Sequence, residues 1–276
     1  MCVMSKFNDK RVLITGGASG IGRLMGAMAL DRGASTLVIW DINQQSIDDT
    51  IAELTAKGKV VGYRVDVSDE QSVIDAVKAV KEQVGQIDIL INCAGIITSN
   101  KTFENYTTAE IHRTMNINTI APMVVALQFL PDMIARNSGH ICNISSAGGL
   151  ISNPKMSVYA ASKWAVIGWS DSIRIEMEQI KSRVKVTTIA PYYIKTGMFD
   201  GVKSPIVPLM KPEYAAKQII RAIERNKNIK VVTKLIPFPY HFVRVMQGIL
   251  PTKFFDWFFG EIFGIYHSMD NFIGRR

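Results

Sequence analysis

The chain has 276 residues, of which 47% are hydrophobic and 20% are charged, and its formal net charge is +8. This composition suffices for one large hydrophobic core and excludes a disordered chain. Because no run of about five like charges occurs, we expect the positive charge to be solvated and no nucleic acid to be a partner.

The cysteines and the N-terminal residues indicate the cellular compartment of the protein. The three cysteines, Cys2, Cys93 and Cys142, lack metal-ligand spacing, so the sequence predicts neither a disulfide framework nor a metal site. A reducing compartment follows, and we expect a cytoplasmic protein. We expect no signal peptide or N-terminal anchor, because the N-terminal residues leave no room for one. The sequence contains no uncharged apolar stretch of about 18 residues, so we expect no membrane-spanning helix.

Apolar β-branched segments alternate with helical periodicity over the first 234 residues. The sequence predicts strands at residues 11–15, 35–41, 60–66, 87–92, 140–145, 184–190 and 229–233. It predicts helices from the first glycine turn to about residue 32, over 43–57, 69–84, 108–136 and 158–179, and from Pro212 onward. We expect Pro122 to bend the longest of them. Such alternation predicts an α/β fold: residues 1–234 form a single doubly wound Rossmann domain with a seven-stranded parallel sheet.

Residues 235–276 differ in composition and are expected to be a C-terminal helical extension of the same domain. They hold eight of the twelve phenylalanines, which is more aromatic surface than an exposed segment of a monomer tolerates. The sequence leaves three functions open for this extension: a lid over a substrate cleft, a subunit interface, or a membrane contact. In the last case the protein would be peripherally membrane-associated, with Lys253, Arg275 and Arg276 facing lipid headgroups.

A glycine-rich turn follows the first strand. The segment T-G-G-A-S-G-I-G covers residues 15–22 and leads into a helix. A dinucleotide pyrophosphate needs close backbone approach and the amides of a helix N-terminus. Gly16, Gly20 and Gly22 meet that need in the required strand–turn–helix context. The alternative is a tight turn without a ligand.

Asp41 ends the second strand, about 20 residues beyond the glycines. An acid at this place accepts hydrogen bonds from the adenosine ribose and repels a 2′-phosphate. The sequence therefore favours NAD over NADP as the cofactor. The alternative is that Asp41 only caps the next helix.

Tyr159 and Lys163 lie four residues apart at the start of a predicted helix, on one helix face. A lysine ammonium group beside a phenol favours the phenolate, and so lowers a pKa that is normally near 10. Ser146, thirteen residues before Tyr159, is placed to hold a substrate oxygen, unless it only caps the fifth strand. Asn118 is placed to hold a water molecule next to Lys163, with plain surface polarity as the alternative.

Taken in order, these motifs resemble the classical short-chain dehydrogenase/reductase family over residues 10–234. The residues that carry the resemblance are the glycine turn at 15–22, Asp66 with Val67, Asn92-Cys93-Ala94-Gly95, Asn118, Ser146, Tyr159 with Lys163, and 191–196. The resemblance implies that Tyr159 is the catalytic acid/base and that Lys163 binds the nicotinamide ribose and lowers the tyrosine pKa. It also implies that Ser146 orients the substrate oxygen and that Asn118 supports a proton relay.

The same resemblance implies the remaining site residues. Those expected to bind the cofactor are Gly16, Ser19, Gly20, Ile21, Gly22, Asp41, Asp66, Val67, Asn92, Ala94, Gly95, Tyr159, Lys163, Pro191, Ile194 and Thr196. Those expected to bind the substrate are Ser146, Tyr192, Tyr193 and Met198. The chain departs from the family pattern at Cys93, where asparagine is usual, and at Tyr192, where glycine is usual. The second departure puts a bulky ring near the nicotinamide pocket.

Residues 12–17, 40–43, 194–199 and 267–270 resemble one branch of the family, which holds retinol dehydrogenases and 17-beta-hydroxysteroid dehydrogenases. This branch implies an NAD(H)-dependent oxidoreductase that interconverts a lipophilic alcohol and its carbonyl compound, the alcohol being a retinoid, a steroid or another hydroxy-lipid. Two alternatives remain: an NADPH-dependent carbonyl or 3-oxoacyl-type reductase, and a non-catalytic protein that binds lipid surfaces. Family habit implies a homodimer or homotetramer through the helices at 108–136 and 158–179.

Overall fold

A computed structural model describes residues 5–204, 207–233, 240–262 and 264–274, and for residues 240–244 it describes the backbone alone. Arg275 and Arg276, which would face lipid headgroups if the extension contacts a membrane, lie outside the described residues.

Seven parallel strands form one sheet, as the sequence predicted. They are β1 (Arg11–Thr15), β2 (Thr36–Asp41), β3 (Lys59–Arg64), β4 (Ile89–Asn92), β5 (His140–Ile144), β6 (Lys185–Pro191) and β7 (Ile229–Val232). Their order is β3-β2-β1-β4-β5-β6-β7, which is the doubly wound arrangement. At the carboxyl end of β1, Thr15 pairs with Trp40 on one side and with Asn92 on the other. The chain therefore leaves β1 and β4 in opposite directions, and a crevice opens between the two strand ends.

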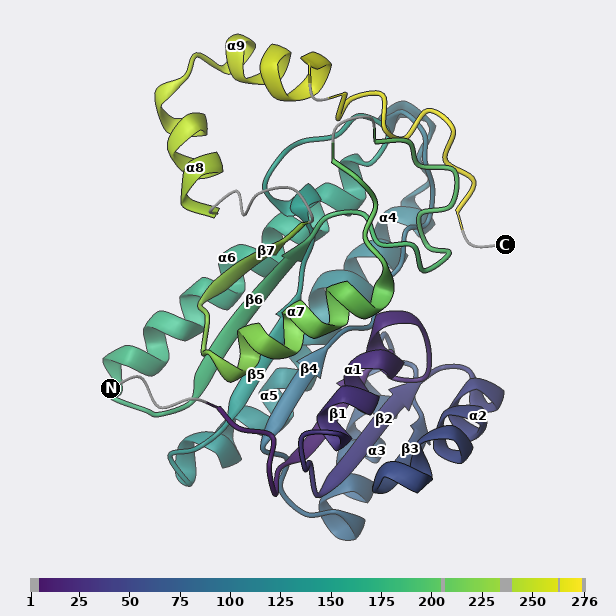
Figure 1. The fold of residues 1–276 in the computed structure, drawn as a ribbon, viewed down its shortest axis with the longest axis vertical. Coiled ribbons are helices and arrows are strands. Elements are labelled where there is room, and N and C mark those ends of the chain that lie inside the picture. The colour runs from purple at the N-terminus through teal and green to yellow at the C-terminus, as the bar shows by residue number, and fades with distance from the viewer. Residues whose placement is uncertain (1–4, 205–206, 234–239, 263, 275–276) are drawn as a thin grey trace.

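Two layers of helices cover the sheet (Figure 1). One layer consists of α1 (Gly20–Leu30), α2 (Gln44–Leu54) and α7 (Pro212–Glu224), and the other of α3 (Glu70–Gln83), α5 (Ala121–Ala135) and α6 (Ser157–Gln179). Side chains alternate between these layers along each strand: Val12 and Ile14 of β1 join the first core, whereas Leu13 joins the second. Each parallel strand is therefore apolar on both faces, which explains the continuous apolar runs in the sequence.

The long predicted helix is irregular in its middle. It begins with α4 (Thr108–Met115) and ends with α5, and a π-helical turn over Asn116–Ile120 joins them. The turn is explained by Pro122, whose ring displaces the carbonyl oxygen four residues earlier. The amide of Ala121 bonds instead to the oxygen of Asn116, five residues back. The expected disturbance at Pro122 is thus one widened turn that precedes the proline.

This same helix bears on the expectation that no membrane-spanning helix is present. The continuous segment Thr108–Ala135 is long and apolar enough, by length and composition alone, to cross a membrane. However, 44% of its most apolar window is buried inside the protein. Phe129 and Met133 of α5, for example, pack into the core under the sheet, and this packing accounts for the apolar composition.

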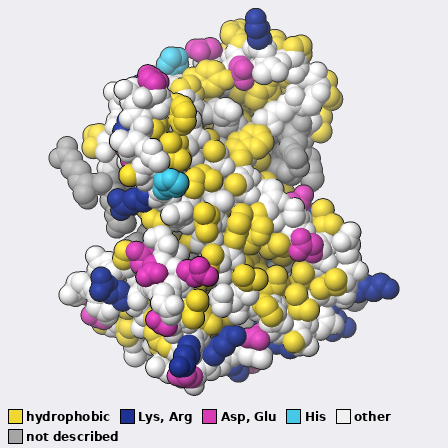
Figure 2. All heavy atoms as spheres, turned by 180° about the vertical axis from the view of Figure 1, so that it is seen from behind, with side chains coloured by type: hydrophobic (Ala, Val, Ile, Leu, Met, Phe, Trp, Pro, Cys, Tyr) yellow, Lys and Arg dark blue, Asp and Glu magenta, His cyan; other side chains and the backbone are white. Residues whose placement is uncertain are grey.

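The C-terminal extension is helical, as expected, and projects beyond the carboxyl edge of the sheet (Figure 1). It consists of α8 (Tyr240–Ile249), α9 (Thr252–Asp256) and a π-helical turn η5 (Trp257–Ile262). We call residues 245–262 the arm. Hydrophobic side chains cover much of its outer surface, at the top of the molecule in Figure 2.

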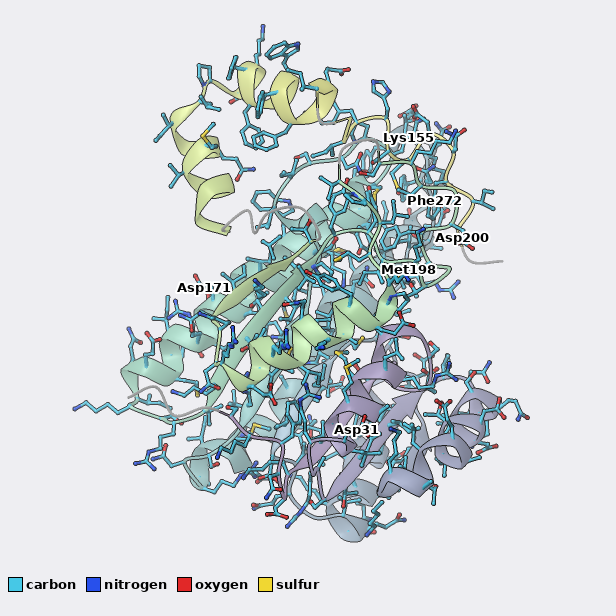
Figure 3. All side chains as sticks on the ribbon, in the orientation of Figure 1. Asp31, Lys155, Asp171, Met198, Asp200 and Phe272 are labelled. Atoms are coloured by element: carbon cyan, nitrogen blue, oxygen red, sulfur yellow. The ribbon has the colours of Figure 1, made fainter. Side chains whose placement is uncertain are left out.

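After the arm, the chain returns along the sheet edge as residues 264–274, which we call the return segment. Phe272 of this segment lies near Lys155, Met198 and Asp200, which come from loops that follow β5 and β6 (Figure 3). Asp31 and Asp171 lie far from this group. The return segment therefore reaches the end of the molecule where a substrate site is expected in an open α/β sheet.

Candidate active site

The glycine turn after β1 has no room for side chains. A Cβ atom on Gly22 would lie 2.0 Å from the carbonyl oxygen of Gly16, and one on Gly16 would lie 3.0 Å from the backbone of Ala94. Gly20 has a φ of +51°, which favours glycine, and a Cβ there would meet only Thr196, at 3.7 Å. These residues leave an open cradle at the start of α1.

The first turn of α1 fits an anion. It contains no acidic residue, and in the described structure the Ser19 side chain does not cap it. The first amides of the helix are therefore available to a pyrophosphate. Asp41 lies close by, because its carboxylate accepts hydrogen bonds from the amides of Ala18, at 3.2 Å, and Asn43, at 3.3 Å. The residues present thus fit a dinucleotide whose ribose would meet an acid.

The structure brings seven of the sixteen expected cofactor residues to one cleft. Those that line it are Ile21, Gly95, Tyr159, Lys163, Pro191, Ile194 and Thr196, together with Cys93, Tyr192, Met198 and Phe199. Asp66 stands just beyond β3, where its carboxylate accepts a hydrogen bond from the amide of Ser68, at 2.9 Å. Val67 and Ala94 border a small hollow next to Thr15.

Asn92 is placed differently from the expectation. Its side chain is 3% exposed and donates to Asn143 Oδ1, at 2.8 Å, and to the carbonyl oxygen of Pro122, at 3.4 Å. These bonds tie β4 to β5 and to α5, so the side chain supports the sheet instead of lining the cleft. The partly exposed Cys93 lines the cleft next to it.

Tyr159 and Lys163 meet on the first turns of α6. The ammonium nitrogen of Lys163 lies 5.8 Å from the centre of the Tyr159 ring and donates to the carbonyl oxygen of Ile144, at 3.0 Å. Both side chains are buried, at 6% and 5% exposure. Ser146 lines the same cleft and lies near enough to the Tyr159 hydroxyl group to lower its pKa. The three polar groups therefore converge on one point at the end of β5.

Asn118 is buried next to this group, so it is not a surface residue. Its Oδ1 accepts from the amide of Ile96, at 2.8 Å, and its Nδ2 donates to the carbonyl oxygen of Ile96, at 2.9 Å, and to Ser162 Oγ, at 3.1 Å. The π-helical turn carries it there. A Cβ on Gly95 would lie 3.3 Å from Asn118 Oδ1 and 3.4 Å from Lys163 Nζ, so the two side chains meet at this glycine.

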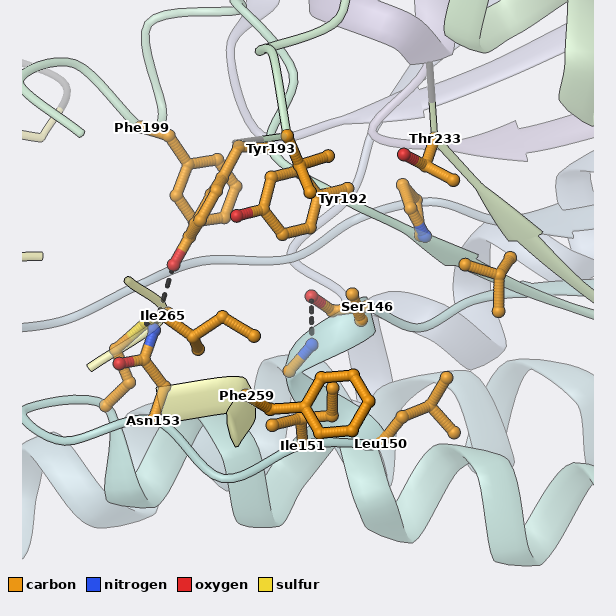
Figure 4. A pocket seen from close by; sticks show the side chains of 16 residues that line it. Ser146, Leu150, Ile151, Asn153, Tyr192, Tyr193, Phe199, Thr233, Phe259 and Ile265 are labelled. Atoms are coloured by element: carbon orange, nitrogen blue, oxygen red, sulfur yellow. Dashed lines mark hydrogen bonds between the residues drawn. The ribbon is translucent and has the colours of Figure 1, made fainter. Parts of the chain in front are cut away.

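A second, larger cavity adjoins Ser146 (Figure 4). It encloses about 940 Å³ including its open mouth, and apolar residues dominate its lining. The lining residues are Ser146, Ala147, Gly148, Leu150, Ile151, Asn153, Met156, Pro191, Tyr192, Tyr193, Phe199, Val207, Val231, Thr233, Phe259 and Ile265. Tyr192 and Tyr193 line this cavity, and Met198 lines the neighbouring cleft, which Ser146 and Tyr192 line as well.

Sequence reasoning missed part of this lining. Leu150, Ile151 and Asn153 lie in the loop that follows β5, and Phe259 and Ile265 come from the C-terminal extension. The aromatic composition of the extension was the available signal, but nothing in the local pattern tells which ring faces the cavity.

A family model for short chain dehydrogenases matches residues 10–206, more than half of the chain. The chain belongs to the short-chain dehydrogenase family. It is therefore an oxidoreductase that acts on CH–OH groups, and dehydrogenases of this family use NAD or NADP.

Individual relatives cover most of this short-chain dehydrogenase. Epidermal retinol dehydrogenase 2 of Mus musculus is 36% identical over 271 residues, covering 96% of this chain and 85% of that protein. Estradiol 17-beta-dehydrogenase 11 of Homo sapiens is 31% identical over 245 residues, covering 88% of this chain and 80% of that protein. The crystal structure of levodione reductase matches with a TM-score of 0.75 and 25% identity, covering 83% of this chain and 97% of that one.

Burial governs the ionisation of the two central residues of this dehydrogenase. It raises the pKa of Tyr159 to about 12, although the hydrogen bond from Ser146 opposes the change. Burial also lowers the pKa of Lys163 to about 8. The lowered tyrosine pKa expected from the sequence is therefore absent from the protein alone, because desolvation of the phenolate outweighs the effect of Ser146. At neutral pH the Tyr159 hydroxyl group therefore keeps its proton.

This ionisation predicts opposite pH dependences for the two reaction directions. Alcohol oxidation needs the phenolate, whose fraction rises about tenfold per pH unit below the pKa. We expect kcat/KM for oxidation to rise from about pH 6 to about pH 8, where Lys163 begins to lose its charge. Carbonyl reduction should stay constant over this range. Initial rates with saturating cofactor measure both, and an oxidation rate that falls with pH would contradict the assignment.

Proposed function

We propose that this short-chain dehydrogenase is NAD(H)-dependent and interconverts a lipophilic alcohol, such as a retinoid, steroid or other hydroxy-lipid, with its carbonyl compound. The apolar cavity beside Ser146 carries the proposal. Among its lining residues that the structure describes, no charged side chain occurs. Such a wall favours an uncharged, largely hydrocarbon substrate, whose burial contributes roughly 25 cal/mol for each Å² of apolar surface.

The proposed chemistry divides among few residues. Tyr159 donates or accepts the proton on the substrate oxygen, and Ser146, which lines the same cleft, holds that oxygen in place. Lys163 and Asn118 meet at Gly95. Lys163 holds the nicotinamide ribose, and Asn118 holds a water molecule that links Lys163 to solvent. When bound, NAD supplies the hydride acceptor next to this group.

The two alternatives have less support. A 3-oxoacyl substrate carried on a phosphate-bearing thiol would need cationic side chains near the cavity, and the described lining offers none. A non-catalytic lipid-binding protein would not need Asn118, Ser146, Tyr159 and Lys163 in one buried cluster. The names of the relatives, a retinol dehydrogenase and an estradiol dehydrogenase, support the lipophilic alcohol.

Loss of the Tyr159 hydroxyl group tests the chemistry. We expect the wild-type protein to reduce NAD with at least one hydroxysteroid, retinoid or long-chain alcohol. Tyr159→Phe should lower kcat by roughly 10²- to 10⁴-fold and leave NADH binding unchanged, since proton transfer is lost but the fold is kept. Absorbance of the reduced nicotinamide measures turnover, and fluorescence titration measures binding. Tyr63→Phe is the matched control, because Tyr63 lies on β3 and bonds only to the exposed Gln83. A fully active Tyr159→Phe variant would refute the mechanism.

Asp41 tests the cofactor preference. Asp41→Ala should lower kcat/KM for NAD by about 10- to 100-fold, the worth of hydrogen bonds to a charged acceptor, and raise kcat/KM for NADP. Steady-state kinetics with each cofactor give the ratio. Asp48→Ala removes an exposed carboxylate of α2, bonded only to Gln44, and should change neither value. A wild-type preference for NADP would overturn the assignment.

Two exposed apolar surfaces support further parts of the proposal. On the arm, the exposed side chains are Val245, Ile249, Phe254, Trp257 and Ile262, with exposures between 45% and 74%. With Lys253 beside them and a net charge of +8, they suit the surface of an anionic membrane, which would make the enzyme peripherally membrane-associated. On the helix layer formed by α3, α5 and α6, Leu127 of α5 and Trp164 of α6 are 65% and 45% exposed. They suit a second copy of the chain in a homodimer or homotetramer.

Two tryptophans distinguish these surfaces. Trp257→Ser should lower binding to phosphatidylcholine–phosphatidylserine vesicles by about tenfold, because one exposed ring no longer enters the lipid, and should leave the oligomer intact. Trp164→Ser should keep vesicle binding but lower the mass of the assembly. Co-sedimentation with vesicles and analytical ultracentrifugation measure the two properties. Vesicle binding that survives Trp257→Ser, or a wild-type monomer, would contradict the respective surface.

A further inference from the structure

Three polar side chains from distant parts of the chain meet in the wall of the substrate cavity. Asn153 Nδ2 lies 2.9 Å from the Tyr193 hydroxyl oxygen and 3.2 Å from Ser268 Oγ, and the two hydroxyl oxygens are 3.0 Å apart. Asn153 and Ser268 are 8% and 1% exposed. We call these three residues the Asn153–Tyr193–Ser268 cluster. Figure 4 shows its bond between Asn153 and Tyr193 at one end of the cavity.

One assignment of the hydroxyl hydrogen atoms satisfies both hydroxyl groups of the cluster. The Ser268 hydroxyl group donates to the carbonyl oxygen of Ile265, at 2.7 Å. Its oxygen is then free to accept from Tyr193, whose own oxygen accepts from the Asn153 amide. Each hydroxyl proton is used once, so the Tyr193 ring has one preferred orientation. Ser268 is the member that belongs to the return segment.

The Tyr193 ring passes this constraint to the reacting centre. Its centroid is 5.0 Å from that of Phe199, and Phe199 is 6.3 Å from Tyr159 in an edge-to-face contact. Met269, the neighbour of Ser268, is 0% exposed and packs in the same hydrophobic cluster as Tyr159. Two routes thus link the return segment to the tyrosine that carries the proton.

The return segment is held firmly enough to serve as a support. Asn100 Nδ2 donates to the carbonyl oxygen of Met269, at 2.7 Å. The amide of Lys203 donates to the carbonyl oxygen of Ser268, at 3.1 Å. The backbone passes so close to Gly201 that a Cβ there would lie 2.0 Å from the Asn271 oxygen. Outside, Lys155 pairs with Asp270 at 2.7 Å.

We propose that Ser268 is a positioning residue for the reaction: it holds the Tyr193 ring as a wall of the cavity and thereby sets where a bulky alcohol lies relative to Tyr159. The inference rests on the proposed function, since it names how that site recognises its substrate. An alcohol that fills the cavity touches this wall and depends on Ser268. A short alcohol that reaches only Ser146 and Tyr159 does not.

The test compares substrates of two sizes. Ser268→Ala should raise KM for a hydroxysteroid about five- to tenfold and leave kcat, KM for NAD and the kinetics of isopropanol unchanged. Tyr193→Phe should act in the same direction, and the double variant should lose little more than Tyr193→Phe alone, because both changes remove one shared contact. Ser268→Thr keeps the hydroxyl group and should stay close to the wild type. Ser172→Ala, which removes an exposed hydroxyl group bonded only within α6, is the matched control.

Hydrogen exchange separates this inference from the proposed function. Ser268→Ala should speed exchange of the Lys203 amide, which donates to the backbone carbonyl oxygen of residue 268. This effect does not depend on the turnover of any alcohol. A wild type that oxidises no alcohol would refute the proposed function, and exchange would still test the cluster. Faster exchange with an unchanged hydroxysteroid KM would overturn the positioning role. Equal losses for hydroxysteroid and isopropanol would also overturn it, because they would indicate general damage.

Discussion

Lys163 is buried beside Tyr159, and the arrangement of the site depends on keeping that ammonium group away from bulk water. A buried charge is costly unless acceptors replace the lost solvent. The carbonyl oxygen of Ile144, at the end of β5, supplies one acceptor. Gly95 leaves the space through which Asn118 reaches the same region. A strand end, a helix start, a π-helical turn and a glycine are therefore all needed at one point.

The fold and the centre of this site could be predicted because their signals are local. Each strand shows its burial as an apolar run, and the glycine turn shows a steric demand that Gly16 and Gly22 confirm. Tyr159 and Lys163 are four residues apart, so helix geometry alone puts them on one face. The prediction for Asn118 needed the family pattern, because a helical asparagine is usually exposed, and this one is buried by a turn that Pro122 causes.

Other features depend on contacts that no local pattern records. Asn92 belongs to the same motif as Gly95, yet its side chain lies between β4 and β5 and bonds to Asn143. The pKa of Tyr159 follows from the balance between desolvation and neighbouring charges, which only the packed structure determines. The cavity lining likewise combines loops after β5 and β6 with residues 259 and 265, more than 50 residues away in the sequence.

The C-terminal extension carries both buried and exposed aromatic side chains, which suit two of the roles that the sequence left as alternatives. Phe255 and Phe259 are buried and pack beside the cavity, while Phe254 and Trp257 on the same short helical stretch are exposed. Apolar side chains on both faces are unusual for a surface helix, which normally turns a polar face to water. If the outer face lies in lipid as proposed, the thickness of one helix separates the lipid from the substrate cavity. The return segment, fixed by Ser268 and Met269, would then keep the far wall in place while alcohols enter beneath the arm. The same 40 residues would thus serve both entry and positioning, which explains why their composition differs from that of the sheet domain.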